Sequence, residues 1–501
     1  MDSSTYFKDL MDEGEFEKLV YIPTIAGMLS DSARRFADRE AAAWAGGVRT
    51  YRELDGDVAA ARGFLKKNGI KPGDHIALAF KNEYDFVRLF YAVTTLGCTA
   101  VLFPVQLPPP AVIGSLKKFE AKMLLFTPEI AATVEPARTA CPDVKFFSAG
   151  DVTDTGKAPA ENHIEKSTPA AIVFTGGTTG TPKGALLSNG ALMRGAQYGS
   201  YVCGEAFFHR YYAMIPFTHV FGLVRNLLTA CYTGSCLYLC ENMKAFMKEL
   251  PAAKPDTMVL VPALAELLYT IASAYGLGAL GGNLKYIICG GAPVPPELIA
   301  KFDKIGVYVL PGYGLTETAN LVSGSGDFRT HPSSVGMPYP GQELKLADGE
   351  LWLKGDNLFD CYYNDPAATA AAFCDGWFKT GDLAKFDEDG RLYIVGRTKN
   401  LIILDNGENV SPEELEALVN AVPFVRDCLV YEDKNDFGAQ VIAVEVLPHE
   451  NTGIADMEAA FKAALTELNR KLPRYMQIDK FTIRTTDFAR SGSMKIIRKA
   501  K

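Results

Sequence analysis

Hydrophobic residues follow two different spacings in the first half of the chain. At 50–68 they recur every three or four positions, which predicts a helix, and a second helix is expected at 84–96. Short apolar runs bounded by turn residues predict buried strands instead, at 74–80, 100–103, 122–126 and 170–174. Because strands and helices alternate, we expect an α/β fold of mostly parallel sheets with helices on both faces.

The pattern changes after about residue 340. Short strands separated by glycine and aspartate turns predict a small β subdomain, with strands at 344–346, 349–354, 377–380 and 391–395. Ser411 and Pro412 then mark a helix start, because serine caps free N–H groups and proline suits the first turn. A small α+β domain follows, with a helix at 455–472 and strands at 427–431, 440–447 and 480–484.

Length and composition narrow the class of protein. A chain of 501 residues is too long for one hydrophobic core, so two or more domains are expected. We place the two domains at 1–396 and 397–501, with a hinge near 397–399. The net charge of -8 argues against nucleic-acid binding. Ten cysteines without a CxxC pair predict reduced core residues. No signal peptide and no run of ~20 apolar residues is visible, so no transmembrane segment and a cytoplasmic location are expected.

One loop rich in glycine and threonine carries the strongest chemical signal. Its glycines let backbone N–H groups approach an anion, its hydroxyls can donate to phosphate oxygens, and its lysine adds positive charge. The lysine precedes a glycine, so this is no Walker A sequence, and the alternative is a plain surface turn. The predicted phosphate-binding residues are Thr175, Gly176, Gly177, Thr178, Thr179, Gly180 and Lys183.

This loop resembles the phosphate-binding signature of the adenylate-forming superfamily, which includes acyl-CoA synthetases, peptide-synthetase adenylation domains and luciferases. Other motifs of that family follow in order over nearly the whole chain, at 290–294, 312–318, 380–382, 396–399, 406–416 and 495. The resemblance implies an AMP-binding adenylation domain at 1–396. It also implies a C-terminal lid domain at 397–501 that carries the catalytic lysine and rotates about the hinge.

The same resemblance implies how the nucleotide is held. Glu317 is the implied Mg²⁺ ligand, since a hard cation takes carboxylate oxygens, and the alternative is an acid at a helix N-terminus. Thr316 donates to the α-phosphate, Tyr313 stacks on the adenine, and Asp382, in a tight Thr-Gly-Asp turn, binds the ribose. The remaining implied nucleotide contacts are Gly290, Gly291, Ala292, Pro293, Gly314 and Arg397.

Three residues of the second domain are implied to act in the two halves of the reaction. Lys495 bridges the substrate carboxylate and the α-phosphate, whose repulsion a cation offsets; the alternative is an exposed tail lysine. Met494 stands where the family has glycine, so the loop before Lys495 departs from the family pattern at this position. Lys399 occupies the hinge, and Gly407 matches the glycine that lines the family's pantetheine tunnel.

The resemblance therefore implies an enzyme that uses ATP and Mg²⁺ to convert a carboxylic acid into its acyl-AMP with release of pyrophosphate. A thiol then takes the acyl group and AMP leaves. Coenzyme A is the expected thiol, and a carrier-protein phosphopantetheine is the alternative. A luciferase-like oxygenase and a non-enzymatic relative are further alternatives; the second should have lost Lys495, Glu317 or the phosphate loop.

The segment Pro216–Leu223 bears on which acid is used. It contains His219 and no acid, whereas amino-acid-activating members carry an aspartate in the matching motif, so it resembles the PxxHxxGL pattern of acyl-CoA ligases. His219, Phe221, Arg225 and Asn320 map to the acyl pocket, with His219 also counted among the catalytic residues. Phe221 and Arg225 are four residues apart on a predicted helix that runs to Leu228, so they share a face. We expect Arg225, with Asn320 or His219, to bind a second polar or anionic group of the substrate. The alternatives are a core-packed His219 and an Arg225 that reaches the surface or pairs with an acid.

Overall fold

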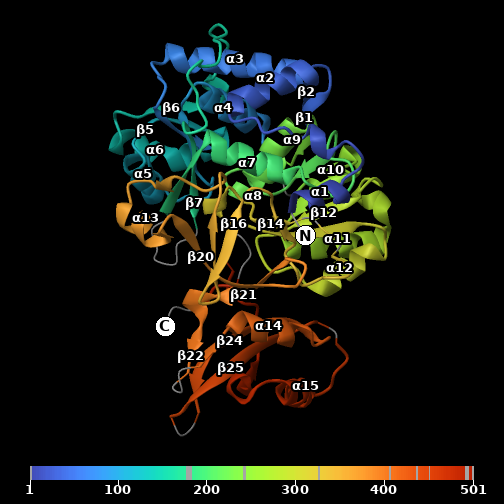
Figure 1. The fold of residues 1–501 in the computed structure, drawn as a ribbon. Coiled ribbons are helices and arrows are strands. Elements are labelled where there is room, and N and C mark those ends of the chain that lie inside the picture. The colour runs from blue at the N-terminus through green and yellow to red at the C-terminus, as the bar shows by residue number, and fades with distance from the viewer. Residues whose placement is uncertain are drawn as a thin grey trace. The chain divides into compact units, whose positions relative to one another are not determined.

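The computed structural model describes residues 3–175, 183–240, 244–324, 326, 328–404, 408–435, 438–450, 452–490 and 496–498 (Figure 1). The fold divides into two compact units, which are described separately. The first comprises Met1–Glu343, Leu353–Phe378 and Glu388–Leu392, and the second comprises Leu344–Trp352, Lys379–Asp387 and Tyr393–Lys501. The second unit thus includes two stretches that precede residue 397, and a domain boundary at 396/397 stays a prediction.

A seven-stranded sheet in the first unit has the order β18-β8-β7-β4-β3-β5-β6. Its strands are β3 (His75–Ala79), β4 (Thr99–Leu102), β5 (Ala121–Phe126), β6 (Lys145–Ser148), β7 (Pro169–Thr175), β8 (Lys183–Ser188) and β18 (Cys361–Tyr362). Strands β3 to β7 pair in parallel. The central residues of β3, β4, β5 and β7 are buried, which explains their continuous apolar runs in the sequence, whereas β6 at the end of the sheet is only half-buried. Strands β8 and β18 add antiparallel pairs at one edge.

A nine-stranded sheet, also in the first unit, has the order β15-β14-β13-β12-β11-β9-β10-β1-β2. Its strands are β1 (Glu40–Trp44), β2 (Gly47–Thr50), β9 (Arg210–Ala213), β10 (Cys236–Leu239), β11 (Thr257–Leu260), β12 (Tyr286–Cys289), β13 (Tyr308–Tyr313), β14 (Ser323–Gly324) and β15 (Met337–Pro338). Its centre is parallel and its two ends are antiparallel. The predicted α/β class with mostly parallel sheets is confirmed.

Helices accompany both sheets, and the two predicted from spacing lie where expected. These are α3 (Tyr51–Lys67), which Thr50 and Glu53 begin with reciprocal capping hydrogen bonds, and α4 (Tyr84–Thr95). The other helices of at least seven residues in the first unit are α1 (Ser3–Leu10), α2 (Ile25–Arg35), α5 (Pro109–Lys118), α6 (Ala131–Ala140), α7 (Asn189–Gly199), α10 (Phe246–Ala253), α11 (Pro262–Tyr275), α12 (Pro296–Asp303) and α13 (Pro366–Ala372).

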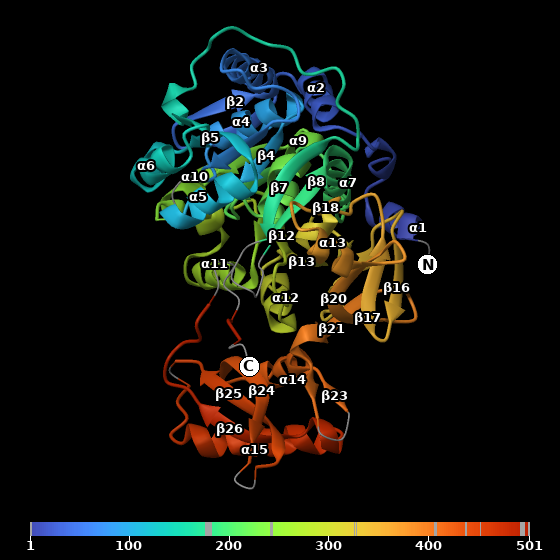
Figure 2. The same cartoon turned by 90° about the vertical axis from the view of Figure 1, so that its left-hand side faces the viewer.

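A long segment between β6 and β7 arches over α3 (Figure 2). Arg62 fixes this segment: its Nε donates to the carbonyl of Ala158 and one Nη donates to Thr95 Oγ1, both at 2.9 Å. Gly63 lies directly beneath it, and a Cβ at that position would overlap the carbonyl oxygen of Gly156. The crossing therefore requires glycine at position 63.

The second unit contains the α+β domain predicted from residue 411. Strands β24 (Val425–Lys434) and β25 (Gln440–Pro448) form an antiparallel pair, and β26 (Ile478–Ile483) pairs with the other side of β25 in parallel. The helices are α14 (Pro412–Asn420) and α15 (Met457–Lys471), and Ser411 caps α14 as expected. The short strands after residue 340 are also present and are divided between the two units: β16 (Glu343–Ala347), β17 (Glu350–Lys354), β19 (Phe373–Cys374), β20 (Trp377–Phe386), β21 (Leu392–Arg397), β22 (Ile402–Ile403) and β23 (Asn409–Val410).

The cysteines are all free, and most of them are buried, as predicted. Cys203 and Cys361 are half-buried, whereas Cys374 on β19 is exposed. Burial raises the pKa of the Cys231 thiol to about 11 and that of Cys98 to about 12. Among the described residues, no helix is long and apolar enough to cross a membrane.

Candidate functional site

The predicted phosphate loop joins two neighbouring antiparallel strands. Thr175 ends β7 and lies opposite Lys183, the first residue of β8. The loop residues between them, including Gly176, Gly177, Thr178, Thr179 and Gly180, lie outside the described residues. The structure thus fixes the two ends of the loop at the carboxyl end of β7.

Glu317, the predicted metal ligand, lies close to this strand pair. The hydroxyl of Tyr362 donates to Glu317 Oε1 at 2.6 Å, and the ammonium of Lys183 lies 4.9 Å from the centre of the same ring. Burial first, and then the negative charge of Glu317, raise the pKa of Tyr362, so its hydroxyl keeps its proton at neutral pH. Tyr362 thus contacts both predicted residues, although no motif in the sequence points to it.

The turn that carries Thr316 and Glu317 is held by an unusual backbone. A short helix at Thr316–Thr318 is followed by Ala319 and Asn320, both with positive φ. A Cβ on Gly314 would overlap the carbonyl oxygen of Asn320, so glycine is required there. The buried Asn357 donates to the carbonyls of Thr318 at 2.9 Å and Leu321 at 2.7 Å. Asn357 is a second supporting residue that the sequence analysis missed.

The predicted adenine contacts follow the end of β12. Gly290 lies against the Phe221 ring, because a Cβ there would be 3.4 Å from Phe221 Cζ and 3.5 Å from the carbonyl oxygen of Gly312. Gly291 has φ of +77°, which favours glycine. Tyr313 ends β13 and is half-buried. The structure therefore brings Phe221, predicted for the acyl pocket, next to Gly290.

His219 is exposed, so the alternative that it packs in the core is wrong. Its Nδ1 accepts a hydrogen bond from the Phe221 N–H at 3.2 Å and caps the short helix α8 (Val220–Gly222). The chain then continues as a π-helix over Leu223–Leu228, where an α-helix was expected. Single π-turns are rare and often mark functional sites. Local spacing could not show this, because Phe221 and Arg225 fit an α-helix equally well.

Arg225 lies in this π-helix and is only 3% exposed, which contradicts the alternative that it reaches the surface. Its guanidinium donates to the carbonyl of Gly199 at the end of α7. Among the described residues its Nε has no hydrogen-bond partner, and the same holds for the side-chain nitrogen and oxygen of the neighbouring, fully buried Asn226. No carboxylate within the described ranges forms an ion pair with Arg225, so the other alternative, an acidic partner, is not observed either. Asn320 is buried as well.

In the second unit the structure brings Asp382 and Arg397 together. Arg397 Nε lies 2.8 Å from Asp382 Oδ1, and the Asp382 side chain is only 2% exposed. Asp382 lies within strand β20 beside Gly381, whose φ is +72°, so the expected tight turn is wrong and the motif is a distortion of a strand. Lys399 lies in a short helix, Thr398–Asn400. Burial, followed by the positive charge of Arg397, lowers the pKa of Lys399.

Two predicted residues of the second unit, Gly407 and Lys495, lie outside the described residues. The residues that flank position 495 are described. Arg490 pairs with Ile496 in an antiparallel bridge and its guanidinium lies 2.6 Å from Asp427 Oδ2. Arg498 bonds Glu416 on α14, whose pKa burial raises to about 7 although Arg498 opposes the shift.

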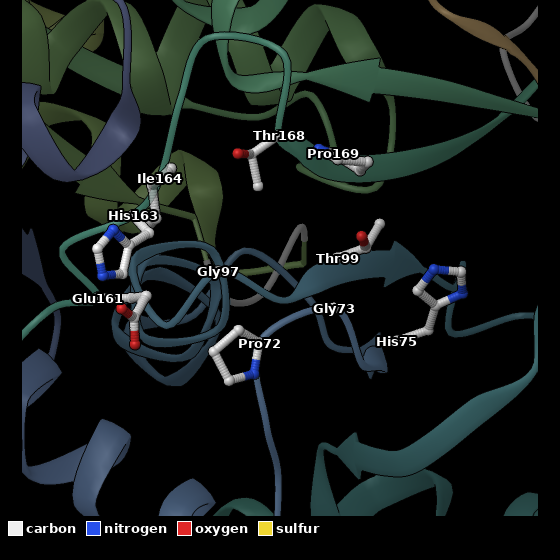
Figure 3. Close-up of a pocket in the computed structure, with 10 residues that line it drawn as sticks. All are labelled: Pro72, Gly73, His75, Gly97, Thr99, Glu161, His163, Ile164, Thr168 and Pro169. Atoms are coloured by element: carbon white, nitrogen blue, oxygen red, sulfur yellow. The ribbon is translucent and has the colours of Figure 1, made fainter.

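A separate cavity of about 380 Å³ lies at the amino-terminal end of the parallel strands of the seven-stranded sheet (Figure 3). Glu161 and His163 line one side of it and His75 the other. Strands β3, β4 and β7 begin here, whereas Thr175 marks the carboxyl end of β7. The cavity contains none of the predicted site residues.

Taken with the fold, these features define a nucleotide-handling α/β enzyme with a small second unit. The model of the AMP-binding enzyme family matches residues 29–363, and the model of the AMP-binding enzyme C-terminal domain matches residues 399–501. The chain belongs to the AMP-binding enzyme family, and the predicted membership of the adenylate-forming superfamily is confirmed.

Similar proteins include several CoA ligases. A long-chain-fatty-acid–CoA ligase of Mycobacterium bovis is 27% identical, with 90% of each chain covered. A feruloyl-CoA synthase of an Amycolatopsis species is 28% identical over 90% of this chain and 93% of that protein. Among solved structures, the o-succinylbenzoate CoA synthetase of Bacillus subtilis with its acyl-adenylate intermediate has a TM-score of 0.80 at 23% identity, covering 94% of this chain and 96% of that one. This structural likeness shows the shared fold.

Proposed function

We propose that this chain is an AMP-forming acid–CoA ligase whose substrate acid carries a second anionic group. One observation carries the first part: Lys183, at the end of the predicted phosphate loop, and Glu317, the predicted metal ligand, contact the same tyrosine. A cation for phosphate oxygens and a carboxylate for a divalent metal thus lie together in a chain of the AMP-binding enzyme family.

The residues present fit Mg²⁺ and ATP. Glu317 supplies a half-buried carboxylate, the ligand type that Mg²⁺ takes, and Oε2 stays available while Oε1 accepts from Tyr362. Bound Mg²⁺ would neutralise charge on the phosphate oxygens. Phe221 and the segment Gly290–Pro293 provide an apolar face and open backbone for the purine. Asp382 and Arg397 offer an acceptor for ribose hydroxyls and donors for ribose or phosphate.

In the first half-reaction the substrate carboxylate attacks the α-phosphorus and pyrophosphate leaves. Lys183 binds phosphate oxygens, Thr316 donates to the α-phosphate, and Lys495 offsets the repulsion between the carboxylate and the phosphate. In the second half-reaction a thiol attacks the acyl carbonyl and AMP leaves. We assign the change from the first half-reaction to the second to a movement of the 397–501 domain about Lys399. This movement withdraws Lys495 and lets the thiol enter along Gly407.

Coenzyme A is the proposed thiol, and it is favoured over a carrier-protein phosphopantetheine because the similar proteins are CoA ligases over about nine-tenths of both chains. A cytoplasmic location remains a prediction. CoA and a carrier protein present the same attacking thiol, so the two acceptors must be distinguished by assay. The measurement is thioester formation with CoA in the absence of any carrier protein.

The second anionic group follows from Arg225. A buried guanidinium without a carboxylate partner costs several kcal/mol, roughly 3–5 by analogy with broken buried ion pairs. Its Nε and the amide of Asn226 remain without hydrogen-bond partners in the described structure. Both lie just after Phe221, which contacts Gly290. A substrate carboxylate or similar anion would pair with Arg225 and accept from Asn226, which removes this cost.

The test is pyrophosphate release over a panel of acids, with and without CoA, in which each dicarboxylic acid is matched with a monocarboxylic acid of equal chain length. The proposal expects diacids to have the higher kcat/KM. Arg225→Gln should lower kcat/KM for diacids at least about tenfold, the loss of one charge-assisted pair, and leave monoacids unchanged. Arg62→Gln, a change of another buried arginine, is the control for general destabilisation. Equal losses for both kinds of acid would contradict the proposed anion site.

A further inference from the structure

Glu317 and Lys183 are both held by one residue from a distant part of the sequence. We propose that Tyr362 is a positioning residue that sets Glu317 and Lys183 in their binding geometry before the nucleotide arrives. This inference rests on the proposed function, because it takes Glu317 as the metal ligand and Lys183 as a phosphate ligand. Tyr362 acts through those two residues and takes no part in the reaction itself.

The backbone of Tyr362 is fixed on the strand that begins with Lys183. In the antiparallel pair of β18 and β8, Tyr362 lies opposite Ala185 and Cys361 lies opposite Leu186. The N–H of Tyr363 donates to the carbonyl of Gly184 at 2.8 Å, directly beside Lys183. The ring therefore has a set position relative to the end of the phosphate loop.

The same segment also holds the backbone of Glu317. The N–H of Phe359 donates to the Glu317 carbonyl at 2.8 Å, and the rings of Phe359 and Tyr362 lie 4.8 Å apart. Asn357 bonds the carbonyl of Thr318, the next residue along from Glu317. Both the main chain and the carboxylate of Glu317 are thus bound by residues 357–362.

The two contacts of Tyr362 have different consequences. Its hydroxyl donates to Oε1, which fixes the carboxylate orientation and leaves Oε2 for a cation. Its ring attracts the Lys183 ammonium, which restrains the lysine at the end of the phosphate loop. Removing the hydroxyl alone should therefore affect metal-dependent binding, whereas removing the ring should also affect binding of the phosphates.

Two variants separate these contacts. Tyr362→Phe keeps the ring and loses the hydroxyl, and Tyr362→Leu loses both. Tyr363→Phe is the matched control, because the Tyr363 hydroxyl donates to the exposed Glu120 at 2.9 Å, a tyrosine–glutamate pair of the same kind outside the site. Thermal unfolding of each variant checks that it folds.

The test measures the dissociation constant of ATP by calorimetry, once with Mg²⁺ and once with EDTA. Tyr362→Phe should bind ATP in EDTA like the wild type and lose about tenfold of the affinity gained from Mg²⁺, as expected for a hydrogen bond to a charged group. Tyr362→Leu should also bind more weakly in EDTA, and Tyr363→Phe should match the wild type in both conditions.

Two results would count against the inference in different ways. A Tyr362→Phe protein with the full Mg²⁺-dependent gain would overturn the positioning role and leave the proposed function intact. A wild-type protein that gains no ATP affinity from Mg²⁺ would overturn the proposed function, and the positioning role with it.

Discussion

Arg498 donates through one Nη atom to both carboxylate oxygens of Glu416, at 2.7 and 2.6 Å. The other Nη donates to the carbonyl of Val430 on β24. On the other side of position 495, Arg490 bonds Asp427, also on β24. The described residues on both sides of Lys495 are therefore bound to the same unit, close to where α14 and β24 meet.

This arrangement predicts that Arg498 affects the half-reaction that uses Lys495. Arg498→Ala should lower the rate of pyrophosphate release about tenfold or more. The reason is that the charge-assisted bond between Arg498 and Glu416, which anchors the chain three residues after Lys495, is lost. Transfer from supplied acyl-AMP to CoA should change little. Comparing the two half-reactions checks this.

Arg470→Ala is the control for Arg498→Ala, because Arg470 forms an exposed pair with Glu467 on α15 and should leave both rates unchanged. Equal slowing of both half-reactions by Arg498→Ala would mean that the residue supports the unit in general.

The Asp382–Arg397 pair predicts a specific effect on nucleotide binding. Asp382→Asn should raise the KM for ATP at least about tenfold, because an amide accepts hydrogen bonds from ribose hydroxyls less strongly than a carboxylate. Steady-state kinetics with varied ATP and saturating acid measures this. Asp389→Asn changes an exposed surface aspartate and should have no effect. An unchanged KM in Asp382→Asn would remove Asp382 from the nucleotide site.

The pair of His209 and Asp256 predicts how stability depends on pH. His209 Nδ1 lies 3.0 Å from Asp256 Oδ1. Burial opposes charge on both, but their hydrogen bond and mutual attraction raise the pKa of His209 above 6.5 and lower that of Asp256 below 3.8. The contribution of His209 to the free energy of unfolding is therefore complete below pH 6.5, and it is lost as the pH rises through the raised pKa of His209. The Asp256 contribution is present above pH 3.8 and is lost as pH falls through its lowered pKa.

Urea unfolding between about pH 6 and pH 9 tests this dependence. The free energy of unfolding of the wild type should fall with rising pH, and this slope should be smaller in His209→Gln. The variant should also lose about 1–3 kcal/mol at the acid end of the window, where the wild-type pair is charged. His163→Gln, at an exposed position, should keep the wild-type slope. A His209→Gln protein with that slope unchanged would assign the pH dependence to other groups.

Two helical glycines give opposite predictions for the same substitution. Gly63→Ala should lower the free energy of unfolding by about 1–3 kcal/mol, because the new methyl group overlaps the Gly156 carbonyl where the long segment crosses α3. Gly114→Ala in α5 meets open space and should be neutral or stabilise by up to about 1 kcal/mol. Denaturant unfolding of both variants measures the difference. Similar stabilities would mean that the crossing segment moves away at little cost.

Local sequence signals were sufficient for most of the fold. Apolar spacing placed α3, α4 and the parallel strands, and Ser411 with Pro412 placed the start of α14, because these features depend on near neighbours. The family motifs placed Glu317 and Lys183 in one site. The contribution of Tyr362 could not be found in this way, since it depends on pairing between β18 and β8, which are far apart in the sequence.

Other features were missed for similar reasons. The π-helix at Leu223–Leu228 has the same apolar spacing over a few residues as an α-helix. Asp382 follows a glycine, which indicates a turn locally, but pairing with neighbouring strands keeps it within β20. The burial of Arg225 depends on how α7 packs against it. No local sequence pattern shows this packing, nor whether the guanidinium finds a partner there.

The distribution of thiols makes the protein suitable for site-selective labelling. A maleimide dye reacts with accessible thiolates, and burial suppresses both access and ionisation at most of the cysteines. Cys374 on β19 is exposed, so the native sequence already offers one preferred attachment point in the first unit. A second cysteine introduced on α15 would then allow the distance between the two units to be followed by energy transfer while acid, ATP and CoA are added in turn.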